Sequence, residues 1–204
     1  MPAPVGQDES SVSRGYGYHG CMRTLALLLI VTVAGLPAQE DKTKKKPKPH
    51  SFDEPGVTCS VPGSWVLAKS VSKMRLATWS MPTKDASADV IAYWFGKNGA
   101  GNLMANLDRW KKQMKTEEEP KPKKIAISKG VTAHLIDARG TYVAPLRPGS
   151  SERNNKPNSR LLAAVIQTPG GPLYVKAVGS AAVIGLHEAG FMAWLKSFKV
   201  QVKK

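Results

Sequence analysis

The chain has 204 residues, of which 42% are hydrophobic and 22% are charged, and these proportions are close to those of ordinary globular domains. They exclude a chain disordered throughout, a collagen-like chain and a polytopic membrane protein. Lysine and arginine outnumber aspartate and glutamate by 30 to 15, which gives a formal net charge of +15. With only two cysteines, a scaffold held by many disulfides is excluded as well.

An uncharged, apolar segment lies near the N-terminus. Arg23 precedes it, and no charged residue follows until after Gln39. A basic residue, an apolar run and small residues in this order are typical of a secretory signal peptide, which we predict over 22–38. The apolar run, roughly a dozen residues, is shorter than the ~20 that a membrane-spanning helix needs. An uncleaved membrane anchor over 24–38 stays the alternative.

The segments on either side of this signal differ in composition from the rest of the chain. Residues 1–21 contain acidic residues that no signal peptide needs, so we predict a mis-called, disordered N-terminal extension before a true start at Met22. Residues 39–51 contain five lysines and two prolines, which predicts a disordered basic linker. Two roles stay open for it: a spacer, or contact with an anionic surface through the lysines of 42–48. The protein is expected to be secreted or periplasmic, without a stable membrane span after cleavage.

A single domain is predicted over 52–202, and its first half is rich in strands. Short apolar or alternating runs bounded by turn residues predict strands over 57–61, 65–67, 75–81 and 89–95. The last of these is apolar on both faces, so we expect it to be central in a sheet.

Two amphipathic helices are predicted. The first covers 102–115, and its apolar stripe consists of Leu103, Leu107, Trp110 and Met114. The second covers 186–198, and its stripe consists of Phe191, Trp194, Leu195 and Phe198. Both stripes have to be buried against another element.

The second half of the domain is again rich in strands, which we predict over 124–127, 131–138, 141–143, 161–168 and 173–179. The last two flank the turn Pro169-Gly170-Gly171-Pro172 and are typical of a hairpin. The longest irregular stretch runs from 145 to 159. Hairpin-like connections favour a mostly antiparallel sheet packed by the two helices, which is an α+β fold.

This layout contains six short motifs: Val61-Pro62-Xaa-Xaa-Trp65, Arg75-Leu76-Ala77-Thr78, Ala92-Tyr93-Trp94-Phe95-Gly96, Gly99-Ala100-Gly101, Asn106-Xaa-Xaa-Arg109-Trp110 and Gly140-Thr141-Tyr142. With them, residues 52–200 resemble uncharacterised secreted bacterial proteins that carry a PsbP-like α/β/α sandwich domain. The motifs are structural rather than catalytic. The resemblance implies the same sandwich and a non-enzymatic binding or assembly module, but no photosynthetic role.

The residues that catalysis would need are scattered. His50, His134 and His187 lie far apart and no CxxC or HxxxH occurs, so no metal site is predicted. No GxSxG elbow is present, and His134 and Asp137, three apart on one predicted strand, are expected to face opposite sides. We therefore predict no catalytic residues.

The glycine-rich turn 96–102 leads from a strand into a helix, as phosphate-binding turns do. It lacks the Gly-Lys-Ser/Thr ending of a P-loop and the third glycine of a dinucleotide site. We therefore predict no cofactor, and only an unspecific anion contact through Lys97.

The leading functional hypothesis is an exported, non-enzymatic binding or assembly module. Its expected contact surface is the 145–159 loop with Arg147, Arg153 and Lys156, because irregular loops on a rigid scaffold commonly carry function; a merely solvated loop stays open as well. The expected partner is a protein or an anionic envelope polymer. Nucleic acid is disfavoured, because the tryptophans lie on periodic faces typical of a core instead of forming stacking platforms.

Two further hypotheses stay open. One is an enzyme whose site is assembled from scattered residues, for which Arg109, Asp137 and Tyr142 are the first candidates. The other is an anionic-surface binder that relies on the basic linker.

Overall fold

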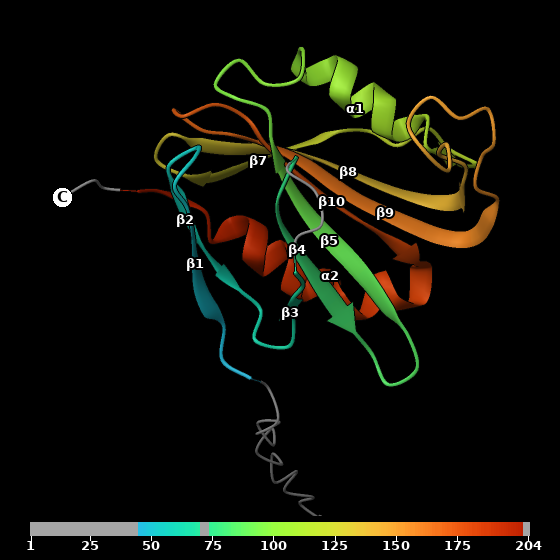
Figure 1. Ribbon diagram of the computed structural model, residues 1–204, viewed down its shortest axis with the longest axis horizontal. Helices are drawn as coiled ribbons and strands as arrows, with labels where there is room; N and C mark the ends of the chain where they lie inside the picture. Colours follow the sequence, from blue (N-terminus) through green and yellow to red (C-terminus); the bar gives the residue numbers. More distant parts are fainter. Residues whose placement is uncertain (1–44, 70–73, 202–204) are drawn as a thin grey trace, which may run out of the picture. The chain divides into compact units, whose positions relative to one another are not determined.

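Eight strands form the larger of two sheets in the computed structural model, which describes residues 45–69 and 74–201 (Figure 1). Their order is β3-β4-β5-β10-β9-β8-β6, and β7 also pairs with β8. All strand pairs among the described residues are antiparallel. The bounds are β3 Val66–Leu67, β4 Arg75–Pro82, β5 Ser87–Trp94, β6 Met114–Lys115, β7 Lys123–Ser128, β8 Val131–Tyr142, β9 Lys156–Gln167 and β10 Leu173–Ser180.

A smaller sheet and two helices complete the fold. The small sheet has the order β1-β2-β11, with bounds β1 Lys48–Phe52, β2 Val57–Val61 and β11 Lys199–Val200. Helix α1 covers Leu103–Lys111 and helix α2 covers Ala181–Lys196. Within the described part of the chain, neither helix has the length and apolar character that crossing a membrane requires.

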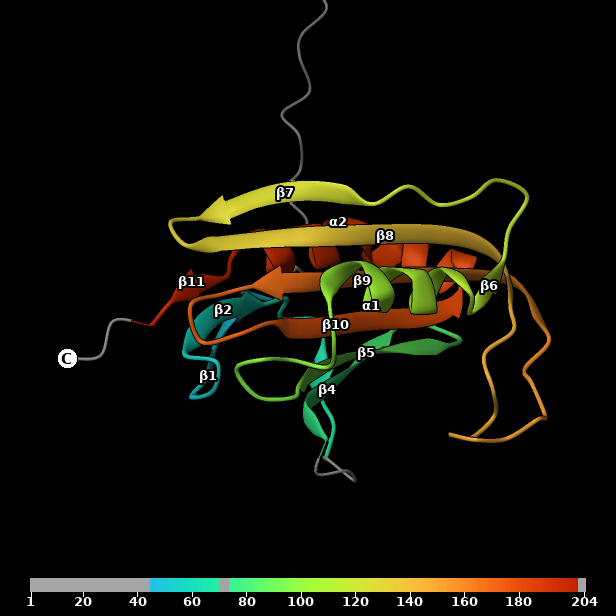
Figure 2. The ribbon, with the colours of Figure 1, turned by 90° about the horizontal axis from the view of Figure 1, so that it is seen from above.

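The large sheet lies between the two helices (Figures 1 and 2). Each of its faces carries its own core. Side chains alternate between the faces of a strand, so β10 sends Val175 and Ala177 to the α2 face and Tyr174 to the α1 face. The α2 face also packs on the small sheet, and its core is rich in tryptophan and phenylalanine. The α1 face packs on Leu107 and Trp110 of the helix.

The α+β class predicted from the sequence is confirmed: a mostly antiparallel sheet is packed by two helices. The predicted hairpin is present as β9 and β10, with Ile166 paired to Leu173. In its turn, the hydroxyl of Thr168 donates to the carbonyl of Gly171 at 2.7 Å. Local turn chemistry therefore sufficed to place this pair of strands.

The predicted linker was wrong at its C-terminal end. Residues 48–51 belong to β1, which pairs with β2 from Lys48↔Val61 to Phe52↔Val57. His50 lies edge-on to Phe52 and Trp79, with ring centroids 4.7 Å and 5.1 Å apart. The strand resembles a linker in composition because it is an edge strand of the sheet, where lysine and proline are tolerated.

The strands predicted over 131–138 and 141–143 are one continuous strand, β8, and further boundaries differ as well. β9 begins at Lys156, so the irregular stretch ends before the predicted residue 159. Helix α1 ends at Lys111, and Met114 lies in β6, still buried on the α1 face. Helix α2 begins at Ala181, five residues before the predicted start, where the Ser180 hydroxyl accepts from the Val183 amide as an N-cap.

The chain divides into two units, 1–40 and 41–204, and all described residues fall in the second. The predicted extension over 1–21 and signal peptide over 22–38 lie outside the described residues.

A candidate anion-binding site

A lysine interrupts the otherwise apolar strand β10. Lys176 points to the α1 face, because its neighbours Val175 and Ala177 lie in the core of the opposite face. Its ammonium group donates to the side-chain oxygen of Gln113 at 3.1 Å and lies 5.9 Å from the ring centroid of Tyr142. Lys176 is thus held between the end of α1 and the end of β8.

The surroundings of Lys176 disfavour its charge. Burial, and after it the positive charges of Arg109 and Arg75, lower the pKa of Lys176 to about 8. Lys176 therefore lies away from water and near two other positive charges, and both conditions raise the free energy of its charged ammonium form. An anion placed among these groups would offset both effects.

Two tyrosines complete this group. Tyr93 on β5 is hydrogen-bonded to Arg75, and burial raises its pKa despite the opposing effect of that arginine. Burial also raises the pKa of Tyr142. Both phenols therefore keep their proton at neutral pH and can donate a hydrogen bond. We call these residues the cationic cluster: Arg75, Tyr93, Arg109, Tyr142 and Lys176.

The buried side-chain amide of Asn106 holds Arg109. The Arg109 guanidinium donates to the Asn106 side-chain oxygen at 2.5 Å. Asn106 is only 1% exposed and donates to the carbonyls of Ala100 and Asn102 at 3.0 Å and 2.9 Å. The arginine thus extends from a fixed base on α1, although its own side chain is exposed.

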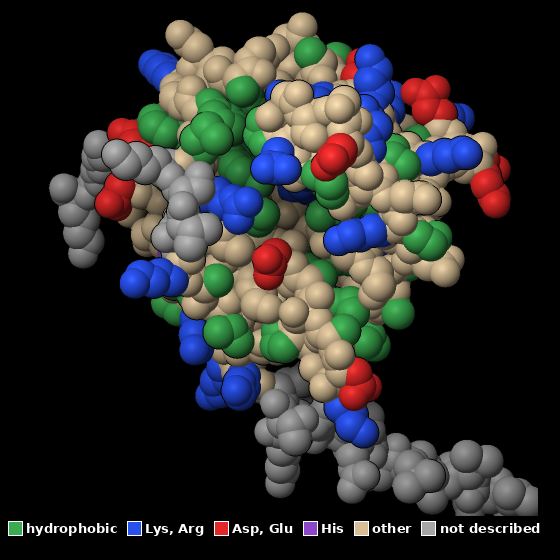
Figure 3. Space-filling view, turned by 45° about the vertical axis from the view of Figure 1, so that its right-hand side comes forward, with side chains coloured by type: hydrophobic (Ala, Val, Ile, Leu, Met, Phe, Trp, Pro, Cys, Tyr) green, Lys and Arg blue, Asp and Glu red, His purple; other side chains and the backbone are tan. Residues whose placement is uncertain are grey.

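The cationic cluster has the chemistry of an anion site. It combines two guanidinium groups, which match the geometry of carboxylate and phosphate, with one ammonium group and two phenol donors. Figure 3 shows one face of the molecule, on which lysine and arginine side chains outnumber the acidic ones that lie among them.

Removing the Lys176 charge is expected to stabilise the protein at neutral pH. The folded-state pKa of about 8 lies below the ordinary ~10.4 of lysine, so the folded state binds fewer protons than the unfolded state between these values. Stability therefore rises with pH across this window, by about 1.4 kcal/mol per pH unit from this group. The difference in unfolding free energy between Lys176→Met and wild type should be positive at pH 7 and shrink from pH 8 to 10.

Urea denaturation of both proteins across this range measures the effect, and taking the difference removes contributions of other groups. Burial raises the pKa of Cys59 to about 11, for example, and this lowers the stability of both proteins alike at high pH. A difference that stays constant from pH 7 to 10 would contradict the assignment.

Of the predicted contact residues, two adjoin the cationic cluster. Lys156 is the strand partner of Tyr142. Arg153 donates from Nε to the Val143 carbonyl at 2.8 Å, and the Val143 amide donates to the backbone carbonyl of Gln113 at 2.8 Å. The loop therefore joins the cluster through Gln113, the residue that holds Lys176.

The other two predicted residues lie apart from that contact. Arg147 is exposed in the loop, where its carbonyl accepts from the Ser150 amide. Lys97 packs against Gly171 so closely that a Cβ atom at position 171 would lie 2.7 Å from the Lys97 backbone. Lys97 also lines a cavity of about 340 Å³ beside the start of α1. The structure does not bring Lys97 together with the loop.

The residues named for an enzyme are not assembled into one site. Arg109 and Tyr142 lie on the α1 face, whereas Asp137 faces α2 and pairs with Arg160. Sequence reasoning missed Lys176 and Arg75. A lone lysine within the apolar run Leu173–Val178 was the available signal. In the part of the chain that the structure describes, no group of three histidine, cysteine or acidic residues lies close enough to hold a metal ion.

Comparison with known proteins gives one kind of match. No family model matches the chain, and no curated protein does. The solution structure of cyanobacterial PsbP from Synechocystis sp. PCC 6803 is similar, with a TM-score of 0.49 and 14% identity over 81% of this chain and 98% of that chain. This likeness concerns the fold alone, and the α+β class stands on the strands and helices of this chain.

Proposed function

We propose that the protein is an exported, non-enzymatic binding module that recognises an anionic group of an acidic protein or an envelope polymer at the cationic cluster. The observation that carries the proposal is the convergence of Arg75 and Arg109 on Lys176. Burial and these two charges together lower the pKa of Lys176 to about 8. Such an arrangement costs folding free energy unless a ligand compensates it. Export is supported by the signal-like order of residues over 22–38.

Ligand binding at this cluster should take up a proton. A bound anion favours the charged form of Lys176 and raises its pKa, so at pH 8 a fraction of the lysines becomes protonated on binding. Calorimetry in two buffers of different ionisation enthalpy measures this uptake.

The direct test is a calorimetric titration of the protein with inorganic triphosphate and with hexaglutamate, two probes that differ in the source of negative charge. In the double variant Arg109→Gln/Lys176→Met, we expect a loss of affinity of about tenfold or more, since hydrogen bonds to charged groups contribute about 1.5–3 kcal/mol each. The matched control is Lys129→Gln/Lys199→Gln, which removes the same net charge from exposed positions.

The control should bind within about twofold of wild type, because separated surface charges are screened by salt. Equal losses in both double variants would mean that binding follows net charge alone and would overturn the site. Absence of binding by both probes in wild type at low salt would overturn the function.

The 145–155 loop is proposed as the outer part of the same contact surface. Lys156 and Arg153 adjoin Tyr142 and Val143, so they can reach a polymer whose anionic group occupies the cluster. Neutralising Arg147, Arg153 and Lys156 should weaken hexaglutamate binding more than triphosphate binding. If the triple variant bound hexaglutamate as tightly as wild type does, the loop would not belong to the contact surface. A variant without residues 40–47 tests the role of the linker in the same assay.

A further inference from the structure

Strand β8 has an open stretch along its outer edge. On one side it is paired with β9 over nearly its whole length. On the other side, β7 pairs with β8 up to Leu135, which lies opposite Lys123, and β6 pairs with β8 beginning at Thr141, which lies opposite Lys115. Residues 136–140 of β8 lie between these two pairings and have no strand beside them within the described chain.

The connector between β6 and β7 cannot fill this place as a strand. It spans residues 116–122 and includes Pro120 and Pro122, which have no backbone N–H to donate to a sheet. Seven connector residues also face five residues of β8, so the chain has to bow outwards. Figure 2 shows the connector running away from β8 between β7 and β6.

A cavity of about 1010 Å³ lies where the connector bows. Its walls come from both sides of the gap, the connector and the β8 edge, together with the starts of β9 and α2. They include residues 115–121, 137–141, 157–159 and Ala181. The five unpaired residues of β8 extend over about 17 Å, so a peptide segment of five extended residues would cover them.

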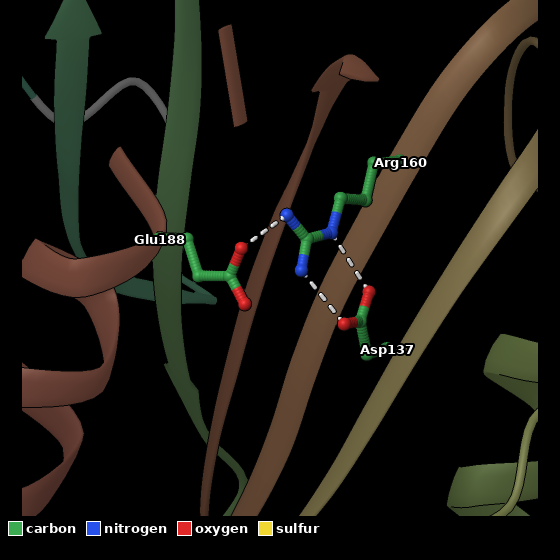
Figure 4. A network of polar contacts seen from close by, with 3 residues as sticks. All are labelled: Asp137, Arg160 and Glu188. Carbon is green, nitrogen blue, oxygen red and sulfur yellow. Dashed lines mark hydrogen bonds and ion pairs between the residues drawn. The ribbon is translucent and has the colours of Figure 1, made fainter. Parts of the chain in front are cut away.

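One end and the floor of the cavity are fixed by specific contacts. At one end, Gly140 packs so closely on the carbonyl oxygen of Lys115 that a side chain at this position would collide with it. On the floor, Asp137 accepts two hydrogen bonds from Arg160, at 2.8 Å and 2.7 Å. Arg160 in turn donates to Glu188 on α2 at 2.7 Å, so that three elements lock the open edge in place (Figure 4).

We propose that this slot binds an extended peptide segment of a partner protein, which adds to β8 as a short strand between β6 and β7. Main-chain hydrogen bonds along an exposed strand edge give such complexes their affinity. The charges around the slot are mixed, because Lys115, Lys121 and Arg139 line it together with the glutamates of 117–119. We therefore expect main-chain pairing to dominate over charge. This site lies apart from the cationic cluster and does not depend on it.

The test uses a phage-displayed library of random heptapeptides selected on the full protein. Enriched peptides are synthesised, and their affinity is measured for wild type and for a variant that lacks Glu117 and Glu118. This deletion shortens the connector to five residues and draws it onto the β8 edge, while it keeps Glu119, the ion-pair partner of Lys111. The matched control is Glu117→Gln/Glu118→Gln, which removes the same charges at full length.

We expect a loss of affinity of about tenfold or more in the deletion variant and a change within about twofold in the control, because the slot and not its charge is removed. A second measurement needs no variant of the protein. Only every second residue of an added strand donates to β8, so N-methylation of one alternate set of peptide residues should abolish binding, whereas N-methylation of the other set should not. The bound peptide should also slow hydrogen exchange of the amides in 136–140.

Three results would overturn the proposal. The library yields no peptide that binds, the selected peptides bind the deletion variant as well as wild type, or the affinity stays unchanged whichever of the two alternate sets of residues is N-methylated. The last result would mean recognition by side chains at some other surface.

Discussion

Asp137→Ala is expected to lower the free energy of unfolding by about 3–5 kcal/mol, because it removes the main partner of a buried charge. Arg160 is 1% exposed, and its guanidinium makes two parallel hydrogen bonds to Asp137 and one to Glu188 (Figure 4). These contacts raise the pKa of Arg160 above its ordinary value, so the group cannot escape the cost by losing its proton. Urea denaturation of wild type and variant measures the loss.

The matched variant Arg160→Met should cost less than Asp137→Ala. It leaves no buried cation, and the two carboxylates that remain have side chains 29% and 45% exposed, so water can solvate them. Methionine also fills part of the space of the arginine stem. We expect a loss of about 1–2 kcal/mol, since replacing a buried ionic group by an apolar one of similar volume is often nearly neutral.

The order of the two variants is the informative result. If Arg160→Met proves more destabilising than Asp137→Ala, the attraction within the triad outweighs desolvation, and the guanidinium is a net source of stability. The inverse order means that the triad mainly fixes geometry. In that case its role is to hold β8, β9 and α2 in register beside the proposed peptide slot.

The parts of the fold that could be predicted are those set by local patterns. The alternation in β4, the apolar run of β5, the apolar stripes of both helices and the turn between β9 and β10 depend on residues close in sequence. Each was placed within a few residues. The glycine-rich turn 96–102 was predicted to lead from a strand into a helix, and Asn102 caps that helix by accepting from the Ala105 amide at 2.7 Å.

The candidate site could not be predicted, because its parts are far apart in the chain. Arg75, Arg109 and Lys176 come from β4, α1 and β10, and their convergence depends on strand order. Single-sequence reasoning instead favoured an irregular loop rich in charge, since composition is the only local signal of a binding surface. The placement of Arg153 and Lys156 beside the cluster joins the two, while the role of the loop stays a prediction.

The buried triad was missed for a similar reason. Arg160 begins a run that is otherwise apolar, Leu161–Ile166, and an arginine at the edge of such a run is usually exposed. Asp137 and Glu188 are 23 and 28 residues away along the chain. Only the pairing of β8 with β9, and the packing of α2 on that sheet face, bring the three together.

Trp194→Ala is expected to lower the free energy of unfolding by about 3–5 kcal/mol, the usual cost of emptying a large aromatic site. Trp194 is 0% exposed and is the centre of an aromatic cluster on the α2 face. Its ring centroid lies 5.3–5.8 Å from those of four neighbours, Trp65, Trp79, Phe191 and Phe198. These rings come from different parts of the fold, so the cavity cannot collapse by moving one element alone.

The indole also has a polar contact, since Nε1 donates to the sulfur of Cys59 at 3.2 Å. Trp194→Phe removes this contact but keeps most of the volume, so its loss should be intermediate. The matched control is Leu186→Ala on the same helix. Leu186 is 75% exposed, and its truncation should change stability by about 0.5 kcal/mol at most. Urea denaturation of the three variants measures the series, and a loss for Trp194→Ala no larger than that for Leu186→Ala would contradict the packing argument.

The same variant separates folding from binding. Trp194 stabilises the α2 face, where β2 of the small sheet and β4 of the large sheet meet the helix, whereas the cationic cluster lies on the α1 face. In the folded fraction of Trp194→Ala, triphosphate should therefore bind with nearly the affinity of wild type, because distant sites without shared partners act additively. A parallel loss of stability and of intrinsic affinity would show that the two faces of the sheet are coupled.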